Sequence, residues 1–472
     1  MTTHALWTAE GLAMACGGTW DGAPPDLLSG FTLDSRIAEP GDVFIALKSN
    51  RDGHDFVGAA FASGAVAALV SRDYVRSAGD GALLRVDDTQ AGLEAIGVGA
   101  RNRLSPSAYV IAVTGSVGKT GTKEMLRLAF SVFGATHAPE KSFNNHWGVP
   151  LTLARMAADT RYGVFEIGMN NPGEITPLSR MVRPDVAIVT TVAPVHLGQF
   201  ASVDEIAEAK AEIFQGLDAE GTAILNRDNA YFDFLARRAR ARGAAVLSFG
   251  QHVDADCRLV TAHADAAGTT AQVVCLGEDH SLRLNVPGAH LVMNALAVLL
   301  AARASGCDVA HAVRALEAFN VPEGRGVVER IAMPDGDVVL IDESYNANPA
   351  SMAAAISVLE LPRAGVNRRV AIVGDMLELG EDGPALHAAL AEDLAAAKVN
   401  AVFACGPLMA HLYEVLSAEQ KGGYAPTAEA LMEAVLRAVK PGDAVMVKGS
   451  LGSRMGPVLA ALKSHLLKNQ AS

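Results

Sequence analysis

The chain has 472 residues, of which 50% are hydrophobic and 19% are charged. This length suits about three domains with substantial cores, and the composition excludes a disordered, a collagen-like and a small disulfide-stapled protein. Lysine and arginine total 39 against 52 acidic residues, which gives a net charge of -13, so nucleic acid is not expected as a main partner.

The cysteines and the first residues bear on the cellular compartment. The five cysteines are widely spaced and form no C-x-x-C pattern, so neither a disulfide framework nor a zinc site is indicated. The first 18 residues lack a basic start and contain Glu10, and no apolar run approaches the roughly 20 residues that span a bilayer. We therefore expect a cytoplasmic protein without integral membrane association.

The first part of the chain, residues 1–106, predicts a small α/β domain. Residues 41–47 are typical of a buried strand, and residues 59–68, rich in small side chains, predict a tightly packed helix. A polar break at 101–106 then separates this domain from the next one.

The remaining chain alternates apolar strand patterns with helical patterns. Unbroken apolar strands indicate parallel sheets covered by helices on both faces. In the expected central domain, residues 107–322, the strand candidates are 109–114, 162–167, 185–190 and 222–226. In the expected C-terminal domain, residues 323–472, they are 338–342, 369–374, 401–405 and 444–448. The predicted class is α/β with three domains, the last of them doubly wound and Rossmann-like.

The strongest local motif is Thr114-Gly-Ser-Val-Gly-Lys-Thr120, which lies between an apolar strand and a helical pattern at 123–130. Such a loop turns backbone N–H groups toward an anion at a helix N-terminus. Lys119 would neutralise terminal phosphate charge, and Thr120 would offer its hydroxyl to magnesium. The usual pattern has glycine at position 113, which is valine here, so the loop is a shortened variant. It predicts a nucleotide-binding site at Gly115, Ser116, Val117, Gly118, Lys119 and Thr120.

A phosphate loop does not by itself define the reaction, because kinases, transporters, switches and ligases all use one. Glu166 ends an apolar strand, where a carboxylate beside bound phosphates could hold magnesium. His196 follows another strand, and Lys210 lies in a helical segment. Taken singly, Glu166 fits a surface carboxylate as well as a magnesium ligand. For His196 and Lys210 taken singly, a loop histidine and a solvated lysine are the favoured interpretations.

Taken together, these features resemble the Mur ligase family, the ATP-dependent amide-forming enzymes of peptidoglycan precursor synthesis, over nearly the whole chain. The resemblance rests on the phosphate loop, Glu166, His196 and the Ala-Lys-x-Glu-Ile-Phe segment around Lys210. It extends to the segments that contain Asn294 and Arg325; Leu291 departs from the family pattern, which often has asparagine there.

The resemblance implies ATP and magnesium as cofactors. It also implies that Lys210 is carbamylated, which turns a cation into a carboxylate-like anion that can face magnesium. The implied magnesium ligands are Thr120, Glu166, His196 and Lys210. The implied catalytic residues are Lys119, Asn145, His196 and carbamylated Lys210. The implied nucleotide contacts outside the loop are Asn294, Arg325 and Asp342.

Three segments are similar to the branch of the family that joins D-alanyl-D-alanine to UDP-N-acetylmuramoyl-tripeptide. Residues 32–36, 40–47 and 52–56 resemble a UDP-binding domain that this branch shares with the branch that adds a single amino acid. Residues 141–150 resemble a loop that reaches toward the reacting phosphate. Residues 342–349 carry Asp-Glu-Ser-Tyr-Asn-Ala-Asn-Pro, and the Glu343 in it leaves the ribose contact open between Asp342 and Glu343. The implied contacts with the two substrates are Ser35, Arg36, Asp52, Gly53, His54, Tyr345, Asn346, Asn348, Lys448 and Ser450.

The resemblance implies a three-step reaction. The γ-phosphoryl group of ATP passes to the substrate carboxylate, the amine of D-alanyl-D-alanine attacks the acyl phosphate, and phosphate departs. Substrates held on three domains require closure, for which residues 322–326 are the expected hinge. A monomer is expected.

Other functions stay open at this point. The nearest are the family branch that adds a single amino acid to the dipeptide precursor, and a folyl-polyglutamate synthetase. From other classes come a switch or transport ATPase and a regulator that has lost catalysis. The switch is disfavoured because no clear Walker-B aspartate follows the loop, and the regulator because Lys119, Glu166, His196 and Lys210 are all present. The third residue of the acceptor peptide is not identified.

Overall fold

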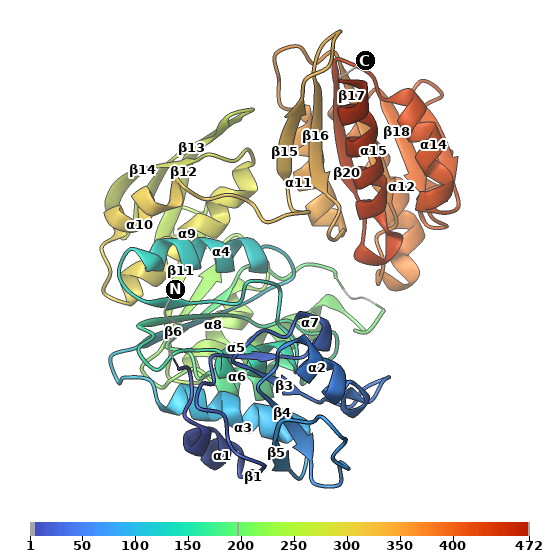
Figure 1. Ribbon diagram of the computed structural model, residues 1–472. Helices are drawn as coiled ribbons and strands as arrows, with labels where there is room; N and C mark the ends of the chain where they lie inside the picture. Colours follow the sequence, from blue (N-terminus) through green and yellow to red (C-terminus); the bar gives the residue numbers. More distant parts are fainter. Residues whose placement is uncertain (1–4, 196–197, 471–472) are drawn as a thin grey trace.

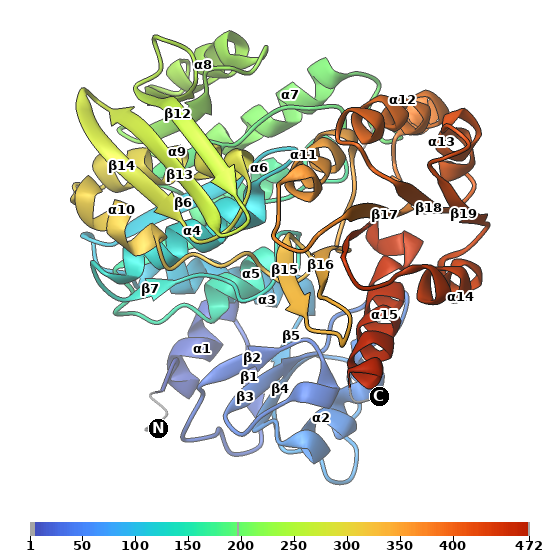
Figure 2. The ribbon, with the colours of Figure 1, turned by 90° about the horizontal axis from the view of Figure 1, so that it is seen from above.

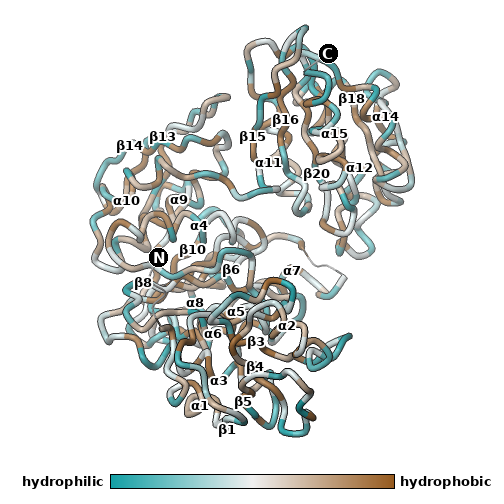
Figure 3. The backbone as a smooth tube through the Cα atoms, in the orientation of Figure 1, coloured by the Kyte–Doolittle hydropathy of each residue, from teal (hydrophilic) through white to brown (hydrophobic). Residues whose placement is uncertain are grey.

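The computed structural model describes residues 5–195 and 198–470, and its strands form three separate sheets (Figure 1). The first sheet lies in the blue N-terminal unit, the second in the central unit and the third in the orange and red C-terminal unit. In Figure 3 the hydrophobic colour follows the strands inside each unit. The predicted α/β class is therefore confirmed.

The N-terminal sheet has the order β1-β5-β4-β3-β2, with β1 antiparallel to its neighbour and the other strands parallel. Its strands are β1 (Thr19–Asp21), β2 (Gly30–Thr32), β3 (Asp42–Ile45), β4 (Ala67–Ser71) and β5 (Ala82–Val86). Its helices are α1 (Ala9–Cys16), α2 (Val57–Ser63) and α3 (Thr89–Asn102).

The helix predicted over residues 59–68 is wrong in its second half. Helix α2 ends at Ser63, because Gly64 has a φ of 126°, which a side chain would rarely adopt. The chain then turns into β4, all of whose residues are buried. Small residues pack well in a helix and in a strand covered on both faces, so the sequence pattern did not separate the two.

The central sheet has the order β14-β13-β12-β11-β10-β9-β6-β8-β7. The predicted parallel arrangement is confirmed from β7 to β12, but β12, β13 and β14 pair antiparallel at one edge, which was not predicted. The strands are β6 (Tyr109–Thr114), β7 (Thr136–His137), β8 (Tyr162–Glu166), β9 (Val186–Val189), β10 (Thr222–Asn226), β11 (Ala245–Gly250), β12 (Cys257–Asp265), β13 (Gly268–Cys275) and β14 (Glu278–Leu284).

Helices cover both faces of the central sheet, and each face has its own apolar core. One face packs against α4 (Lys119–Ser131), α9 (Ala289–Ala304) and α10 (Val309–Leu316). The other packs against α6 (Ile175–Val182), α7 (Val203–Ala211) and α8 (Phe232–Arg240), with part of α5 (Gly148–Ala154). Because helices cover both faces, the end of the sheet at which the parallel strands terminate is left open. Ligands bind at this end in folds of this kind.

The C-terminal sheet has the order β15-β16-β20-β17-β18-β19, with β15 antiparallel at the edge, so the doubly wound prediction is confirmed. Its strands are β15 (Val327–Ile331), β16 (Val338–Glu343), β17 (Arg368–Gly374), β18 (Ala401–Cys405), β19 (Lys421–Ala425) and β20 (Asp443–Lys448). Its helices are α11 (Pro349–Glu360), α12 (Gly383–Ala396), α13 (Met409–Val415), α14 (Ala428–Ala438) and α15 (Met455–Asn469). Helices α14 and α15 pack on the face opposite to the other three.

The N-terminal and central units share an apolar core. Leu151 and Ala154 of α5 belong to the same cluster as Trp7 and the buried residues of α3. The Trp7 indole N–H donates to the carbonyl of Ala154 at 2.9 Å. The predicted boundaries at residues 106 and 322 stay predictions, and the first of them lies beside this shared core.

The C-terminal unit lies apart from the core that the first two units share. In Figures 1 and 2 it stands beside the central unit, to which it is joined through the segment after α10. Among the helices of residues 5–195 and 198–470, none is long and apolar enough to cross a membrane.

The guanidinium group of Arg103 strengthens the contact between the first two units. It donates to the carbonyls of Leu6 at 2.7 Å and Met156 at 2.6 Å, and it lies 3.8 Å from the centre of the Trp7 ring. Arg103→Met should lower the free energy of unfolding by about 2 kcal/mol, because it removes charged hydrogen bonds from a partly buried site. Thermal or urea unfolding measures this effect.

Arg72 supplies the matched control, since its side chain is half exposed and pairs with exposed Asp87. Arg72→Met should change the free energy of unfolding by no more than about 0.5 kcal/mol. Equal losses in the two variants would contradict the role given to Arg103.

Candidate functional site

The phosphate loop joins β6 to α4, as predicted, and its geometry requires two glycines. Gly115 has a φ of 147°, and a Cβ there would lie 1.9 Å from the Thr190 hydroxyl oxygen. Gly118 has a φ of 85° and precedes α4, and a Cβ there would lie 2.7 Å from the Asn294 amide oxygen. The loop can therefore bring its backbone close to an anion at the N-terminus of α4.

Lys119 lies over this loop. Its ammonium group donates to the carbonyl of Gly115 at 2.6 Å. Burial lowers the pKa of Lys119, and the negative charge of Glu166 opposes that shift. A bound phosphate would offer the ammonium group a stronger partner than a neutral carbonyl.

Glu166 is 1% exposed at the end of β8 and is held by two neighbouring elements. Its carboxylate accepts a hydrogen bond from the Thr120 hydroxyl at 3.0 Å and one from the Asn144 amide at 2.7 Å. The hydroxyl of Ser142 lies 3.2 Å from that of Thr120. The structure thus brings together the predicted Thr120 and Glu166 and adds Ser142 and Asn144.

Sequence reasoning missed Ser142 and Asn144 although it singled out the segment that contains them. Asn145, the residue chosen there, lines the cleft, but its side-chain oxygen accepts hydrogen bonds from the backbone of Trp147 at 3.1 Å and Gly148 at 2.9 Å. It therefore holds the start of α5, which leaves its NH₂ group available to a ligand. The two adjacent asparagines drew attention to this loop, but only the fold shows that Asn144 contacts Glu166 and that Asn145 contacts the start of α5.

The Lys210 side chain is 1% exposed near the end of α7. Burial lowers the pKa of Lys210 well below the ordinary lysine value, and the charge of Lys119 lowers it further, while Glu212 opposes the shift. The solvated alternative for this lysine is therefore wrong. His196, predicted beside it, lies outside the described residues.

A cleft of about 1030 Å³ runs from the phosphate loop to the C-terminal unit. Thirteen of the predicted residues line it, together with Glu343: Ser116, Val117, Gly118, Lys119, Thr120, Asn145, Glu166, Asn294, Arg325, Tyr345, Asn346, Asn348 and Lys448. Asn226 and Phe249 also line it and were not predicted. Their position in the sequence could have identified them, because residues at the carboxyl ends of parallel strands, here β10 and β11, are candidates for ligand contact.

Both candidates for the ribose contact, Asp342 and Glu343, lie at the end of β16, and only one of them lines the cleft. The Asp342 carboxylate accepts hydrogen bonds from the backbone of Gly324 and Ser344, both at 3.0 Å, and does not line the cleft. Glu343 does line the cleft. The guanidinium of Arg325 lies 4.2 Å from the centre of the Tyr345 ring at the same mouth. Geometry therefore favours Glu343 over Asp342 as a ligand contact.

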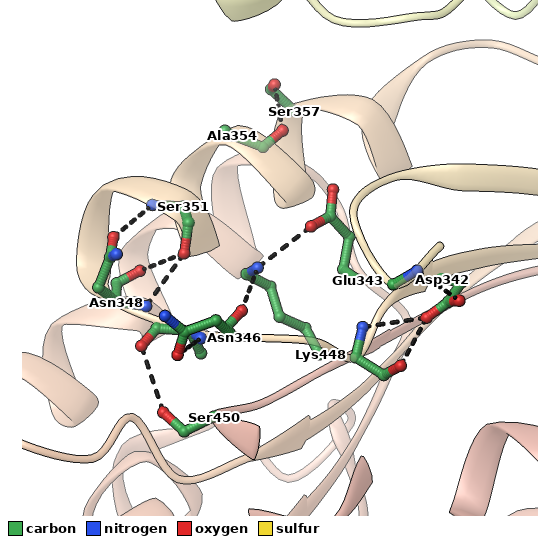
Figure 4. A network of polar contacts seen from close by, with 12 residues as sticks. Asp342, Glu343, Asn346, Asn348, Ser351, Ala354, Ser357, Lys448 and Ser450 are labelled. Carbon is green, nitrogen blue, oxygen red and sulfur yellow. Dashed lines mark hydrogen bonds and ion pairs between the residues drawn. The ribbon is translucent and has the colours of Figure 1, made fainter. Parts of the chain in front are cut away.

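Figure 4 shows the polar network at the C-terminal wall of the cleft. The buried ammonium group of Lys448 lies 3.2 Å from the Glu343 carboxylate and donates to the carbonyl of Asn346 at 2.9 Å. Ser450 donates to the carbonyl of Ala347 at 3.3 Å and accepts from the backbone of Leu377 at 2.9 Å. Lys448 lines the cleft, whereas Ser450 does not and instead holds two loops of the C-terminal unit together.

The residues predicted to bind the UDP precursor lie in the N-terminal unit, away from this cleft. Arg36 is paired with Asp34 at 2.6 Å, which holds the pKa of Asp34 at about 2. His54 uses both ring nitrogens within the protein: one accepts from the Ser71 backbone at 2.9 Å and the other contacts Asp52 at 2.6 Å. Ser35 is buried at the start of a short 3₁₀ helix, and Gly53 starts a second one, so these turns have fixed shapes.

A phosphate loop that faces a buried carboxylate, in a cleft that reaches a second α/β unit, defines a nucleotide-dependent enzyme whose active site lies between two units. The family model for the Mur ligase middle domain matches residues 113–302, and the one for the Mur ligase, glutamate ligase domain matches residues 328–451. The chain belongs to the Mur ligase family, whose members are ATP-dependent amide-forming ligases.

Individual relatives are similar over almost the whole chain. A protein of Escherichia coli (strain K12) named UDP-N-acetylmuramoyl-tripeptide–D-alanyl-D-alanine ligase is 34% identical, over 93% of this chain and 94% of its own length. The crystal structure of MurF from Acinetobacter baumannii is 31% identical with a TM-score of 0.84, covering 97% of this chain and 99% of that one. MurF from Thermotoga maritima, solved in complex with ADP, is 27% identical with a TM-score of 0.75, covering 93% of this chain and 98% of that one.

The burial of Lys210 leads to a prediction about the stability of the protein. Its pKa is lower in the folded protein than the ordinary 10.5, so folding must release its proton at any pH between these two values. This penalty is fully present below the folded pKa and disappears as the pH rises above about 10.5. In carbon-dioxide-free buffer, Lys210→Met should therefore raise the thermal midpoint at pH 7 and raise it less at pH 10.

The control for this comparison is Lys398→Met, a lysine on the exposed surface of the C-terminal unit. That variant should show no pH-dependent gain. A Lys210→Met protein that is less stable than the parent at pH 7 would contradict the burial argument.

Proposed function

We propose that this chain joins D-alanyl-D-alanine to UDP-N-acetylmuramoyl-tripeptide at the expense of ATP, giving the pentapeptide precursor of peptidoglycan, ADP and phosphate. The observation that carries the proposal is the cleft, which has the phosphate loop on one wall and Lys448 of the C-terminal unit on the other. The name of relatives that match more than nine-tenths of the chain supports the choice of substrates.

The chemistry explains why both walls are needed. A carboxylate does not react with an ammonium group in water, because its oxygen is a poor leaving group and the amine is protonated. Transfer of the γ-phosphoryl group makes an acyl phosphate, whose phosphate can leave when the amine attacks. The acyl phosphate must be kept from water until the amine reaches it, which requires a closed cleft.

The main electrostatic barrier is the repulsion between the substrate carboxylate and the nucleotide phosphates. The backbone N–H groups at the start of α4 and the ammonium group of Lys119 offset it. Asn145 would orient the reacting end with its free NH₂ group. Asn294 and Arg325 would contact the nucleotide, with Glu343 replacing Asp342 at the ribose.

Magnesium fits the residues beside the phosphate loop. Thr120, Ser142, Asn144 and Glu166 supply oxygen atoms, which are the ligands that this ion prefers. Among residues 5–195 and 198–470, no three side chains of the His, Cys, Asp or Glu type converge, so phosphate oxygens would complete the shell. When bound, the ion neutralises charge on the nucleotide. We assign Thr120 and Glu166 to one ion, and His196 with carbamylated Lys210 to a second.

The environment of Lys210 supports its carbamylation. An amine must be neutral to attack carbon dioxide, and burial, which lowers the pKa of Lys210, favours the neutral form. The N–C bond forms as the amine loses a proton, and the product is an anion in place of a cation. The positive charge of Lys119 would then stabilise this anion.

The binding sites for the two acceptor substrates complete the proposal. Ser35, Arg36, Asp52, Gly53 and His54 would hold the UDP precursor in the N-terminal unit. Lys448 would bind the carboxylate of the dipeptide, with Tyr345, Asn346, Asn348 and Ser450 around it. Residues 322–326 would act as the hinge, and the chain would work as a monomer in the bacterial cytoplasm. No described contact favours the alternative ligase that adds a single amino acid.

The first test is phosphate release from ATP by the purified protein, with and without each of the two acceptor substrates. We expect release to require both substrates, and the product mass to equal their sum minus water. Release without them, or a product extended by a single amino acid, would refute the proposed substrates.

The role of Lys210 can be tested by chemical rescue. Lys210→Ala should lose at least about 100-fold in kcat and recover part of it when a short carboxylic acid is added, because the acid replaces the missing carbamate. Full activity without rescue would overturn the assignment. Lys398→Met, on the exposed surface of the C-terminal unit, is a control that the added acid should not affect.

A further inference from the structure

We infer that Lys123 is a positioning residue that anchors the loop of Ser142, Asn144 and Asn145 to the phosphate-loop helix. This inference rests on the proposed function and adds to it a residue without contact to either substrate. Lys123 lies one helical turn after Lys119 in α4, and its side chain is completely buried. A lysine is rarely buried unless its charge has a specific partner.

The partners of Lys123 lie on two different segments. Its ammonium group is paired with Glu124 on the same helix, and it donates a hydrogen bond to the carbonyl of Pro139 at 2.8 Å. Pro139 is buried where the chain enters the loop of residues 140–147. The buried cation therefore connects the helix of the phosphate loop to the residue that precedes the neighbouring loop.

The loop depends on such anchors because, among residues 140–147, Trp147 alone packs against an apolar core. No residue from 140 to 147 is fully buried. At its far end, Asn145 holds the start of α5 through two backbone N–H groups. The carbonyl of Asn144 accepts a hydrogen bond from Gly168 at 2.8 Å. At its near end, Lys123 makes the corresponding contact through Pro139.

The segment between these anchors carries the groups that meet the phosphate loop. Ser142 contacts Thr120, and Asn144 contacts Glu166, at 3.2 Å and 2.7 Å. Contacts of this length fail if the loop moves by about 1 Å, since hydrogen bonds weaken steeply with distance. Release of the near end should therefore disturb the contacts of Glu166 and leave the backbone of the phosphate loop in place.

Lys123→Met tests this inference, with Arg127→Met as the matched control. Arg127 also pairs with Glu124, at 2.8 Å, but its side chain is half exposed and does not reach the loop. Lys123→Met should lower kcat by at least tenfold and raise the magnesium concentration needed for half-maximal rate. Its Kd for ADP, measured by calorimetry without magnesium, should stay within threefold of the parent. Arg127→Met should leave all three quantities unchanged.

Lys123→Arg keeps the cation and separates positioning from folding. It should retain ADP binding and more of the kcat than Lys123→Met does, because a guanidinium group can still donate to Pro139. The inference is overturned if Lys123→Met keeps the parental kcat, or if ADP binding and kcat fall together in both variants. A parent protein that joins no substrates would instead refute the proposed function, so the two failures are distinguishable.

Discussion

Two donors from different elements hold the Glu166 carboxylate at the edge of the central sheet: the Thr120 hydroxyl from α4 and the Asn144 amide from the loop before α5. A buried carboxylate is stable only where such donors or a cation satisfy it. This contact sets the distance between the phosphate loop, strand β8 and the loop of residues 140–147. The cleft around the nucleotide takes its shape from that distance.

The arrangement of charge over the cleft follows from what it must hold. Lys119, Arg325 and Lys448 come from the central unit, the hinge and the C-terminal unit, and all three line the cleft. Anionic substrates in the cleft would therefore meet cations from both walls. The N-terminal unit shares an apolar core with the central one, whereas the apolar cores of the C-terminal unit are its own.

The sequence predicted the long apolar strands more accurately than the helix at 59–68 and the antiparallel edge of the central sheet. Apolar runs such as 109–114 and 401–405 are long enough, and buried enough on both faces, to have one structural solution. The stretch at 59–68 has small side chains that suit two solutions, and Gly64 decided between them. The antiparallel edge of β13 and β14 was missed because its residues alternate between buried and exposed and carry little apolar signal.

The sequence by itself determined the phosphate loop. Its glycines shape the turn and its lysine meets an anion within one short segment, so the pattern can be recognised without any distant residue. The positions of Glu166 and Lys210 in the sequence left simple alternatives open, and the resemblance to the family selected these two residues as candidates. Only the tertiary structure decided that Glu343 and not Asp342 faces the cleft, that Ser142 and Asn144 meet the phosphate loop, and that Lys123 is buried. These facts depend on contacts between segments far apart in the chain, and a linear pattern carries no record of such distances.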